Sequence, residues 1–532
     1  TGDEGKKDIR NRKNTQFTYQ ADVQYNYDPY PGLAVNSIAG AQVFDRRIKS
    51  SGIEKKDYLT SLITDVEAAV EYTDGWEGLT HYREAGIFTE HSLAYLNQYY
   101  LSFMLRKDYA STIGKEAPSI IYPRASFALR LDKYSFFPSF FNMMKIRTAY
   151  GETGVLPGRR DAVRLLWYGD PSAYGVGAQI SQIGNEKLKP ERIKEFELGF
   201  DAELFRNYSV EFTYYKQNAE ESIVGAWEPP STGKRSNAIP FNVGKVKGWG
   251  IESLIQARPV TTKNFQLDLS LTNNYQTNEV IDMGDSLNII YGSRGINVIK
   301  EGLEKHAFYA TKVKGALFKE DGTYNGPEFE DEAKYLGTPI PPYTGSFSLN
   351  ARILKNFNLN VLLDWATGHT ILNYTLKKAS SYSVIPRQRE LQCLLGMDMY
   401  YKEADYEGPV SAEYYNSIEP LEVGSPAYIA AANEYAQYEY YNPNFLEPAD
   451  YFKLREISIS YKFMDLLKKF VGNPLFSDLV VGFSARNIWR ATKYSGPCVE
   501  LNYSGSRSLN RGVDFYTLQL PRVYNFWFRF SL

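Results

Sequence analysis

Histidine is scarce in this 532-residue sequence. The four copies are His81, His91, His306 and His369, and none lies at metal-ligand spacing from a cysteine or a carboxylate. The Gly-x-Ser-x-Gly, His-Glu-x-x-His and phosphate-loop motifs are also missing. We therefore expect no metal site, no cofactor and no catalytic centre, and interpret the histidines as ordinary surface or loop residues.

Cysteine is scarcer still. Cys393 and Cys498 lie far apart in tyrosine-rich polar segments that we interpret as loops. A disulfide between them is possible in an oxidising compartment, but two incidental thiols are the favoured interpretation.

Long apolar runs and excess charge of one sign are absent as well. No run of about eighteen apolar residues occurs, which excludes helical membrane spans. The formal net charge of -2 gives no footprint of nucleic-acid binding. The sequence begins at Thr1 without a signal segment, and we expect that processing or truncation removed one.

Aromatic residues are abundant by contrast. The chain has 43 Tyr, 30 Phe and 7 Trp, together 15% of its residues. That fraction is heavy for a soluble protein, but it suits the two aromatic girdles of a membrane β-barrel.

Two long stretches alternate between apolar and polar residues. They run from Glu195 to Leu204 and from Val210 to Tyr214, separated by a turn at 205–207. Such alternation is typical of a β-hairpin with one apolar and one polar face, and the run is of the length that crosses a bilayer as a strand, about nine to eleven residues.

The period of two, extended to the last strand, assigns residues to faces. We predict that six apolar residues face lipid: Phe196, Leu198, Phe200, Phe526, Phe528 and Phe530. Four charged residues should face the lumen: Glu195, Glu197, Glu203 and Arg529. The alternating carboxylates of 195–203 could suggest acid/base catalysis, but a hydrated lumen face explains their strand spacing better.

The same region resembles the SusC/RagA family of TonB-dependent outer-membrane transporters. Its hallmark there is an Asn, then Leu-x-Pro-Glu, then a strand ending in Glu-Leu-Gly-Phe-Asp. Here the residues are Asn185, Leu188, Pro190, Glu191 and the segment 197–201.

Further motifs recur in the family's order over roughly residues 90–532. They are Phe137-Pro138-Ser139, Arg147 to Gly154, Asn242-Val243-Gly244, Gly250-Ile251-Glu252, the GFSARN segment up to Asn487 and Tyr494 to Glu500. The last departs from the family pattern, because Cys498-Val499-Glu500 stands where the family has Asp-Pro-Glu.

The resemblance implies an all-β, antiparallel transmembrane β-barrel with long extracellular loops. Short periplasmic turns alternate with long outer loops in such barrels. We find short connections at 28–32, 97–98, 132–141, 205–207, 259–263, 354–356 and 464–477. Long ones fall at 46–87, 107–123, 151–191, 219–246, 277–343, 367–450 and 491–520. Fifteen strands satisfy this alternation, with a β-bulge between Leu454 and Ile457, where the apolar phase slips by one.

Fifteen strands are fewer than the twenty-two of SusC-like barrels. Two unpaired strand edges in lipid would be intolerable. We therefore expect residues 1–532 to be the C-terminal part of a barrel whose plug domain, TonB-contacting segment and first strands lie outside this sequence.

Three loop features need weighing. The acidic segment 320–331 stands where many relatives carry a calcium-loop pattern, but its carboxylates lack that spacing, so we interpret it as a solvated loop. Residues 503–506 form a turn, not a phosphate loop. The long connections also contain clustered tyrosines whose aromatic rings could bind a sugar or a peptide, although packing within the loops accounts for them equally well. They are Tyr400, Tyr401, Tyr414, Tyr415, Tyr438, Tyr440 and Tyr441.

By resemblance the function is TonB-driven import of an oligosaccharide or a peptide across the outer membrane of a Gram-negative bacterium. The implied partners are a SusD-like surface lipoprotein, the TonB complex and the lipid bilayer. The substrate-binding residues are unknown. A siderophore- or cobalamin-type receptor is the first alternative, and an outer-membrane enzyme is a weaker one.

Overall fold

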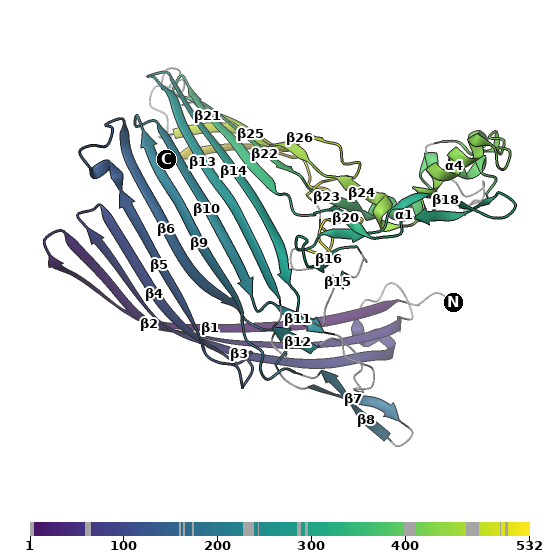
Figure 1. Cartoon of the computed structure of the whole chain (residues 1–532), viewed down its shortest axis with the longest axis horizontal. Coiled ribbons are helices and arrows are strands. Elements are labelled where there is room, and N and C mark those ends of the chain that lie inside the picture. Colours follow the sequence, from purple (N-terminus) through teal and green to yellow (C-terminus); the bar gives the residue numbers. More distant parts are fainter. Residues whose placement is uncertain are drawn as a thin grey trace. The chain divides into compact units, whose positions relative to one another are not determined.

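The main sheet has fifteen strands that follow one another in chain order (Figure 1). The computed structural model describes residues 5–58, 65–158, 161–162, 165–172, 175–182, 184–226, 239–242, 244–284, 289–292, 296–397, 410–463, 478–500, 502–505 and 509–531. The order begins at β1 and ends at β28, so among these residues the two terminal strands each have one neighbour.

The predicted number of strands is confirmed. Their bounds are β1 Lys6–Tyr30, β2 Leu33–Tyr58, β3 Ala69–Tyr95, β4 Tyr99–Ala110, β5 Ile120–Arg130, β6 Phe141–Val155, β9 Glu191–Leu204, β10 Tyr208–Glu220, β13 Lys245–Thr261, β14 Phe265–Asp282, β21 Tyr343–Ile353, β22 Phe357–Thr367, β25 Tyr451–Lys462, β26 Asp478–Thr492 and β28 Val523–Ser531. From the connection after β6 onward, long and short connections alternate as predicted, and the turn at 464–477 lies outside the described residues. Nearer the start the prediction was wrong, because the connections after β2 (59–68), β4 (111–119) and β5 (131–140) have similar lengths.

The chain divides into two compact units, which we describe separately. Unit 1 comprises Thr1–Tyr134, Lys145–Leu198 and Gln217–Lys245. Unit 2 comprises Ser135–Met144, Gly199–Lys216 and Val246–Leu532.

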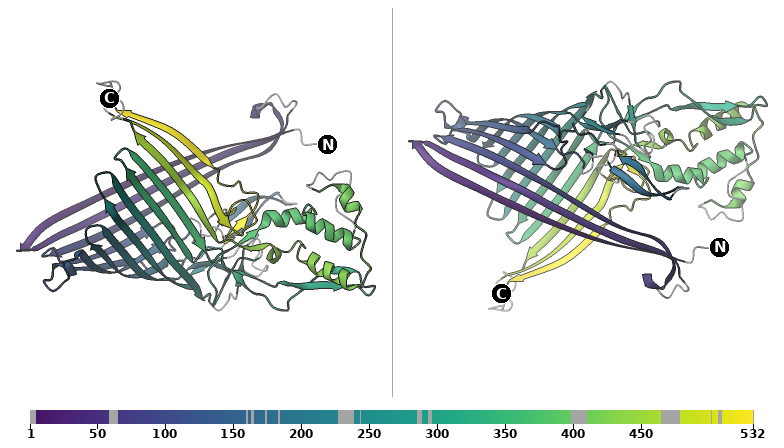
Figure 2. Two further views of the ribbon diagram at one scale, coloured as in Figure 1. Left: turned by 90° about the horizontal axis from the view of Figure 1, so that it is seen from above. Right: turned by 90° about the horizontal axis from the view of Figure 1, so that it is seen from below.

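The interpretation of 46–87 as an irregular loop was wrong. In unit 1 β2 continues to Tyr58 and β3 begins at Ala69, so that β1, β2 and β3 are 25, 26 and 27 residues long and pair with one another in that order (Figure 2). Opposite charges meet across the strands, as in Lys6–Glu54 at 2.8 Å and Lys56–Glu71 at 3.1 Å. The many charged residues of this segment suggested a loop, but a paired β-strand can carry charged side chains on a face that is exposed to solvent.

The bulge predicted between Leu454 and Ile457 is confirmed in unit 2. Leu454 pairs with Leu363 of β22 and Glu456 pairs with Leu362, so Arg455 is the extra residue. The register of β25 with β26 also shifts at Arg455, but there two residues of β26, Asn487 and Ile488, stand opposite it. Because one residue is inserted, Arg455 and Glu456 both leave the apolar row while Leu454 and Ile457 stay in it.

The long connections carry structure of their own. Their strands are β7 Leu165–Ser172, β8 Gly175–Gln182, β11 Ile223–Ala226, β12 Ile239–Asn242, β15 Ile289–Tyr291, β16 Val298–Lys300, β17 Phe308–Ala310, β18 Val313–Phe318, β19 Tyr324–Phe329, β20 Lys334–Gly337, β23 Thr370–Asn373, β24 Leu446–Pro448 and β27 Val513–Asp514. The helices are α1 Tyr374–Ser381, α2 Pro386–Leu394, α3 Ala412–Asn416 and α4 Pro426–Ala436, with 3-10 turns at Val66–Ala68, Leu131–Lys133 and Asn442–Phe445.

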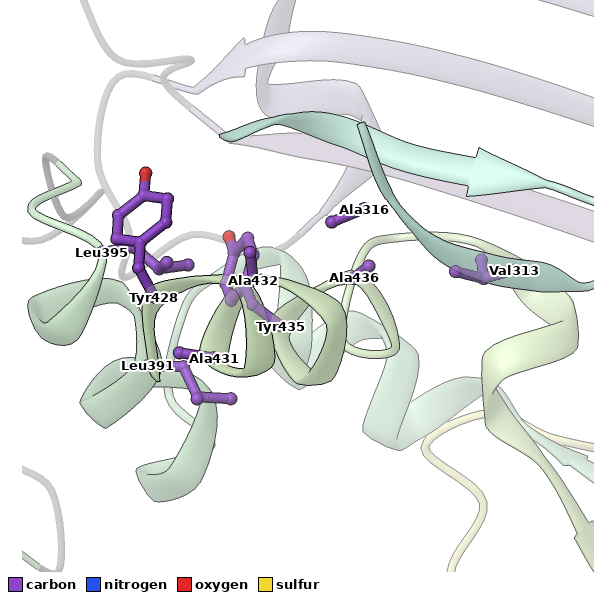
Figure 3. Packing of buried hydrophobic residues seen from close by; sticks show 9 residues of the cluster. All are labelled: Val313, Ala316, Leu391, Leu395, Tyr428, Ala431, Ala432, Tyr435 and Ala436. Atoms are coloured by element: carbon purple, nitrogen blue, oxygen red, sulfur yellow. The ribbon is translucent and has the colours of Figure 1, made fainter. Parts of the chain in front are cut away.

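The helices were not predicted from the sequence, although α4 has clear start signals. Ser425 caps its first turn by accepting from the Tyr428 backbone N–H, and Pro426 occupies the first helical position. Tyr428, Ala432 and their neighbours pack on α2 and β18 in a buried cluster (Figure 3). Nowhere in the described ranges is a helix both long and apolar enough to cross a membrane.

The strands have two different faces. In β9, Phe196 and Leu198 are exposed, whereas Glu195 accepts from Gln217 at 3.0 Å and Glu197 lies 3.8 Å from Arg147. In β28, Phe526 and Phe528 are exposed on one face and Arg529 alternates with them. That the apolar face meets lipid stays a prediction.

Candidate functional site

Three of the sequence motifs form two polar junctions, one in each unit, at the strand ends that carry the long connections: the Leu-x-Pro-Glu segment, the Asn242 motif and the Tyr494 motif. In unit 1 the Asn242 side chain donates to the carbonyls of Lys189, at 2.8 Å, and Glu221, at 3.0 Å. Its own oxygen accepts from the Lys189 N–H at 2.8 Å. We call this cluster the Asn242 junction.

The Leu-x-Pro-Glu segment supplies the other half of the Asn242 junction. Leu188 is fully buried, and its carbonyl accepts from the Gly114 N–H at 2.9 Å. The Glu191 carboxylate accepts from the Ile223 N–H at 2.8 Å. Two motifs more than fifty residues apart thus close on each other and fasten three long connections to the sheet.

In unit 2 the Tyr494 motif forms the second cluster, the Tyr494 junction. The Tyr494 hydroxyl donates to Asp514, which is fully buried, at 2.8 Å. Ser495 donates to Glu447 from its backbone at 2.8 Å and from its hydroxyl at 2.7 Å, and Asn373 donates to the same carboxylate at 2.9 Å. Burial raises the pKa of Asp514 and of Tyr494.

Glu500 ends the Tyr494 motif and carries the charge of this junction. It accepts from Lys453, a buried lysine, and from Arg455 at 2.5 Å, and Arg455 also reaches Asp364 at 3.0 Å. Burial raises the pKa of Glu500, but the hydrogen bonds from Arg455 and Lys453 outweigh it and hold the pKa below its usual range. Arg455, the extra residue of the bulge, thus binds two carboxylates, those of Glu500 and Asp364.

Both junctions hold loops and show no catalytic arrangement. Each carboxylate is met by hydrogen-bond donors, which leaves no poised acid or base facing a reactant. No group of three or more metal-ligating side chains occurs in the part of the chain that the structure describes. Neither cysteine forms a disulfide, and Cys393 lies in α2 and not in a loop.

The histidines pair with groups far away in sequence. His81 lies 3.1 Å from Asp45, and His369, which is buried, lies 4.0 Å from Asp450. His91 contacts Ser37 at 2.9 Å. Burial lowers the pKa of His306 to about 4, so this residue is neutral at physiological pH.

The acidic segment and the tyrosines are mostly engaged in local contacts. Asp321 accepts from Thr323 at the β18–β19 turn, while Glu328 pairs with Lys314 at 2.9 Å and Glu330 with Lys334 at 2.6 Å. Residues 503–505 form the predicted turn.

The tyrosines divide between packing and exposure. Tyr415 is buried and Tyr441 contacts Thr311, whereas Tyr414 and Tyr440 stay exposed. Tyr400 and Tyr401 lie outside the described residues. Ligand contact by the tyrosines stays a prediction.

Each unit also has a hollow near its short connections. In unit 1 a hollow of about 590 Å³ is lined by small residues such as Ser92, Ser102 and Ser126, with Arg147 at its rim. In unit 2 a hollow of about 670 Å³ is lined mainly by polar residues, among them the ion pair Arg258–Asp268 at 2.5 Å.

Comparison with known proteins identifies the fold. The family described as TonB dependent receptor-like, beta-barrel, matches residues 2–385. The chain belongs to this family. Such receptors lie in the outer membrane of Gram-negative bacteria, and this SusC-like receptor shares that location.

The similar proteins are distant in sequence. TonB-dependent receptor P3 of Formosa agariphila is 23% identical over 479 residues, which cover 82% of this chain and 44% of that protein. TonB-dependent receptor SusC of Bacteroides thetaiotaomicron is 20% identical over 416 residues, covering 75% and 38%. A structure of the RagAB peptide transporter matches with a TM-score of 0.78 at 17% identity, covering 99% of this chain and 56% of that one. The chain thus spans about half the length of these relatives, or less.

We predict that Glu500→Gln loosens the last long connection of the receptor. The substitution leaves the buried Lys453 ammonium without its anion and weakens the grip on Arg455. We expect the free energy of local opening to fall by roughly 2 kcal/mol, measured by hydrogen exchange of amides in residues 493–500.

The matched control is Glu456→Gln. Its partner Arg486 is a half-exposed arginine at 2.9 Å, so the same measurement should change by less than about 1 kcal/mol. Lowering the pH gives an independent check. Because the pKa of folded Glu500 is depressed, its stabilisation is complete above the unfolded value of about 4.3 and is lost as the pH falls through the folded value. The Glu500→Gln variant should not show this loss of stability at low pH. If the variant still loses stability over the same pH range, another group is responsible.

Proposed function

We propose that this chain forms the C-terminal part of an outer-membrane importer for a large nutrient, an oligosaccharide or a peptide. A SusD-like lipoprotein would bind the nutrient at the cell surface, and the TonB complex would supply energy through a plug domain. The observation that carries this proposal is the fifteen-stranded sheet whose order ends at β1 and β28. The membership of the TonB-dependent receptor family supports it.

The direction of the two terminal strands supports a larger barrel. Strands β1 and β28 run in the same direction, because β1 leads into the short connection to β2 and β28 follows the long connection after β26. An antiparallel barrel can close between two such strands only through an odd number of additional strands. The number in SusC-like barrels, twenty-two, would require about seven.

The two faces and the hollows fit transport. An apolar, aromatic face suits lipid, and a face with Glu197 and Arg147 suits a hydrated lumen. The hollows near the short connections would receive the plug domain. The loops, fastened by the two junctions, would form the platform for the lipoprotein.

We predict opposite accessibility for adjacent residues of β9. In the full-length receptor, Glu197→Cys should react with a small water-soluble thiol reagent at least about tenfold faster than Leu198→Cys, because position 198 faces lipid. Labelling of whole cells followed by mass spectrometry measures this. Equal rates in correctly folded variants would contradict the assignment of the faces.

We predict that the 532 residues alone do not close a barrel. Lipid-facing backbone groups at β1 and β28 must be paired by further strands. The isolated chain should show no heat-dependent change in gel migration and no ion conductance in planar bilayers, whereas the full-length receptor should migrate faster before boiling. Conductance and heat-dependent migration of the isolated chain would refute the proposed strand count.

We predict that deleting the receptor gene abolishes growth on a large nutrient. Growth on the corresponding monosaccharide or amino acid should persist, because small solutes pass through porins. The full-length receptor should also co-purify with a SusD-like lipoprotein from the same gene neighbourhood. Unchanged uptake of every oligosaccharide and peptide tested would exclude the proposed cargo while leaving the barrel intact.

A further inference from the structure

The outer face of β1 has two aromatic pairs separated by small and aliphatic residues. Phe17 stacks on Tyr19, with ring centroids 6.3 Å apart, and Tyr25 stacks on Tyr27 at 5.0 Å. The centres of the two pairs lie eight residues apart, which corresponds to a rise of about 21 Å on a strand tilted by about 40°. The two pairs thus lie near the two edges of an apolar band about 25 Å tall, where the aromatic girdles of a barrel lie.

The register extends the upper girdle across neighbouring strands of unit 1. Tyr19 lies in one cross-strand row with Val43 of β2, Ala85 of β3 and Tyr109 of β4. Tyr109 is exposed, and the Lys107 ammonium lies 5.2 Å from its ring centre. Since short connections are periplasmic, this girdle marks the boundary with the outer leaflet headgroups.

Immediately beyond this girdle, on the same face, the side chains become cationic. The next row pairs Phe17 with Asp45 and Arg83. The rows after it place Arg47 beside His81, and Lys13 beside Lys49. We call Lys13, Arg47, Lys49 and Arg83 the cationic ledge.

One buried carboxylate organises the cationic ledge. Asp45, 8% exposed, lies 2.5 Å from Arg83, 3.1 Å from His81 and 3.3 Å from Arg47. A single carboxylate cannot neutralise two guanidinium groups. The Arg47 and Arg83 side chains stay 54% and 61% exposed, so part of each guanidinium is free of protein cover.

The position of this charge is informative. A soluble nutrient would travel along the opposite, polar face of the strands, so the cationic ledge does not lie on that path. A surplus of guanidinium and ammonium groups just outside an aromatic girdle is where anionic lipid headgroups lie. Arginine also binds phosphate in a bidentate manner.

We propose that the cationic ledge binds the phosphate groups of a lipid in the outer leaflet. Asp45 contacts both Arg47 and Arg83 and so orients their guanidinium groups side by side. Lys13 and Lys49 extend the site away from the membrane. The acyl chains of the lipid lie against the outer face between the two aromatic pairs. The inference does not depend on which nutrient is imported.

The test uses the full-length receptor in detergent and bisphosphorylated lipid A as the probe, titrated by native mass spectrometry. We expect Arg47→Gln combined with Arg83→Gln to weaken binding by about tenfold or more, because two charged hydrogen-bond donors are lost. Lys13→Gln combined with Lys49→Gln leaves the contacts of Asp45 intact and should weaken binding several-fold. The second pair keeps the test valid if the first variant folds poorly.

The matched control removes two charges from the opposite face of the same strands. Arg12→Gln combined with Arg46→Gln should change binding by less than about twofold, because Arg46 points toward Asn14 and Tyr82 on that face. If this control weakens lipid binding as much as the Arg47 and Arg83 variant does, the effect comes from net charge alone and the proposal is overturned.

Two further arms distinguish the source of the phosphate. Dephosphorylated lipid A should bind at least about tenfold more weakly, and inorganic phosphate should not displace the lipid at equal concentration. Equal binding of the dephosphorylated lipid would show acyl contact alone. Displacement by inorganic phosphate would show a site for free anions, and either outcome would overturn the proposal.

Discussion

Every backbone N–H and C=O inside a bilayer must be paired within the protein, since lipid offers no alternative partner. Strand-to-strand pairing meets this requirement for the thirteen inner strands of the sheet, and it leaves β1 and β28 as the places where the chain depends on something else. The strict neighbour order of the sheet is a consequence of that one rule. Because the pairing fixes the backbone as extended strands, successive side chains point to opposite faces, and the sequence alternates between residues suited to each face.

Outside the bilayer the constraint changes, because water competes for every hydrogen bond. The long connections are therefore fastened by buried polar groups and not by backbone pairing alone. Asn242 satisfies backbone groups of Lys189 and Glu221, and Glu447 gathers Ser495 and Asn373. Fully matched donors and acceptors make such clusters specific, since a displaced loop would leave buried charge unpaired.

A change along one strand face records the boundary between the two environments. On β1 the aromatic pair Phe17–Tyr19 is followed within a few residues by Lys13, and the neighbouring strands supply Arg47 and Arg83. The strands do not stop at the membrane boundary, and the long pairing of β1 with β2 continues to Lys6. The same backbone ladder serves both environments, and only the side chains change.

The sequence alone determined the barrel strands, because a period of two with long runs reflects burial that repeats along each strand. It also determined the bulge at Arg455, since one inserted residue shifts the phase of every apolar position after it. The full lengths of β2 and β3 and the four helices were not predicted, because charged strands and short loop helices show weak hydrophobic periodicity. For α4 a signal was available, since Ser425 and Pro426 are typical residues for the start of a helix.

The junctions were decided only by the tertiary structure. Tyr494 and Glu500 were visible as a motif, yet their partners come from separate loops and strands: Asp514 for Tyr494, and Lys453 and Arg455 for Glu500. The pairing of His81 with Asp45 arises in the same way. A local pattern reports which face a residue occupies, whereas long-range contacts depend on strand register and on loops closing over distances that no spacing in the sequence encodes.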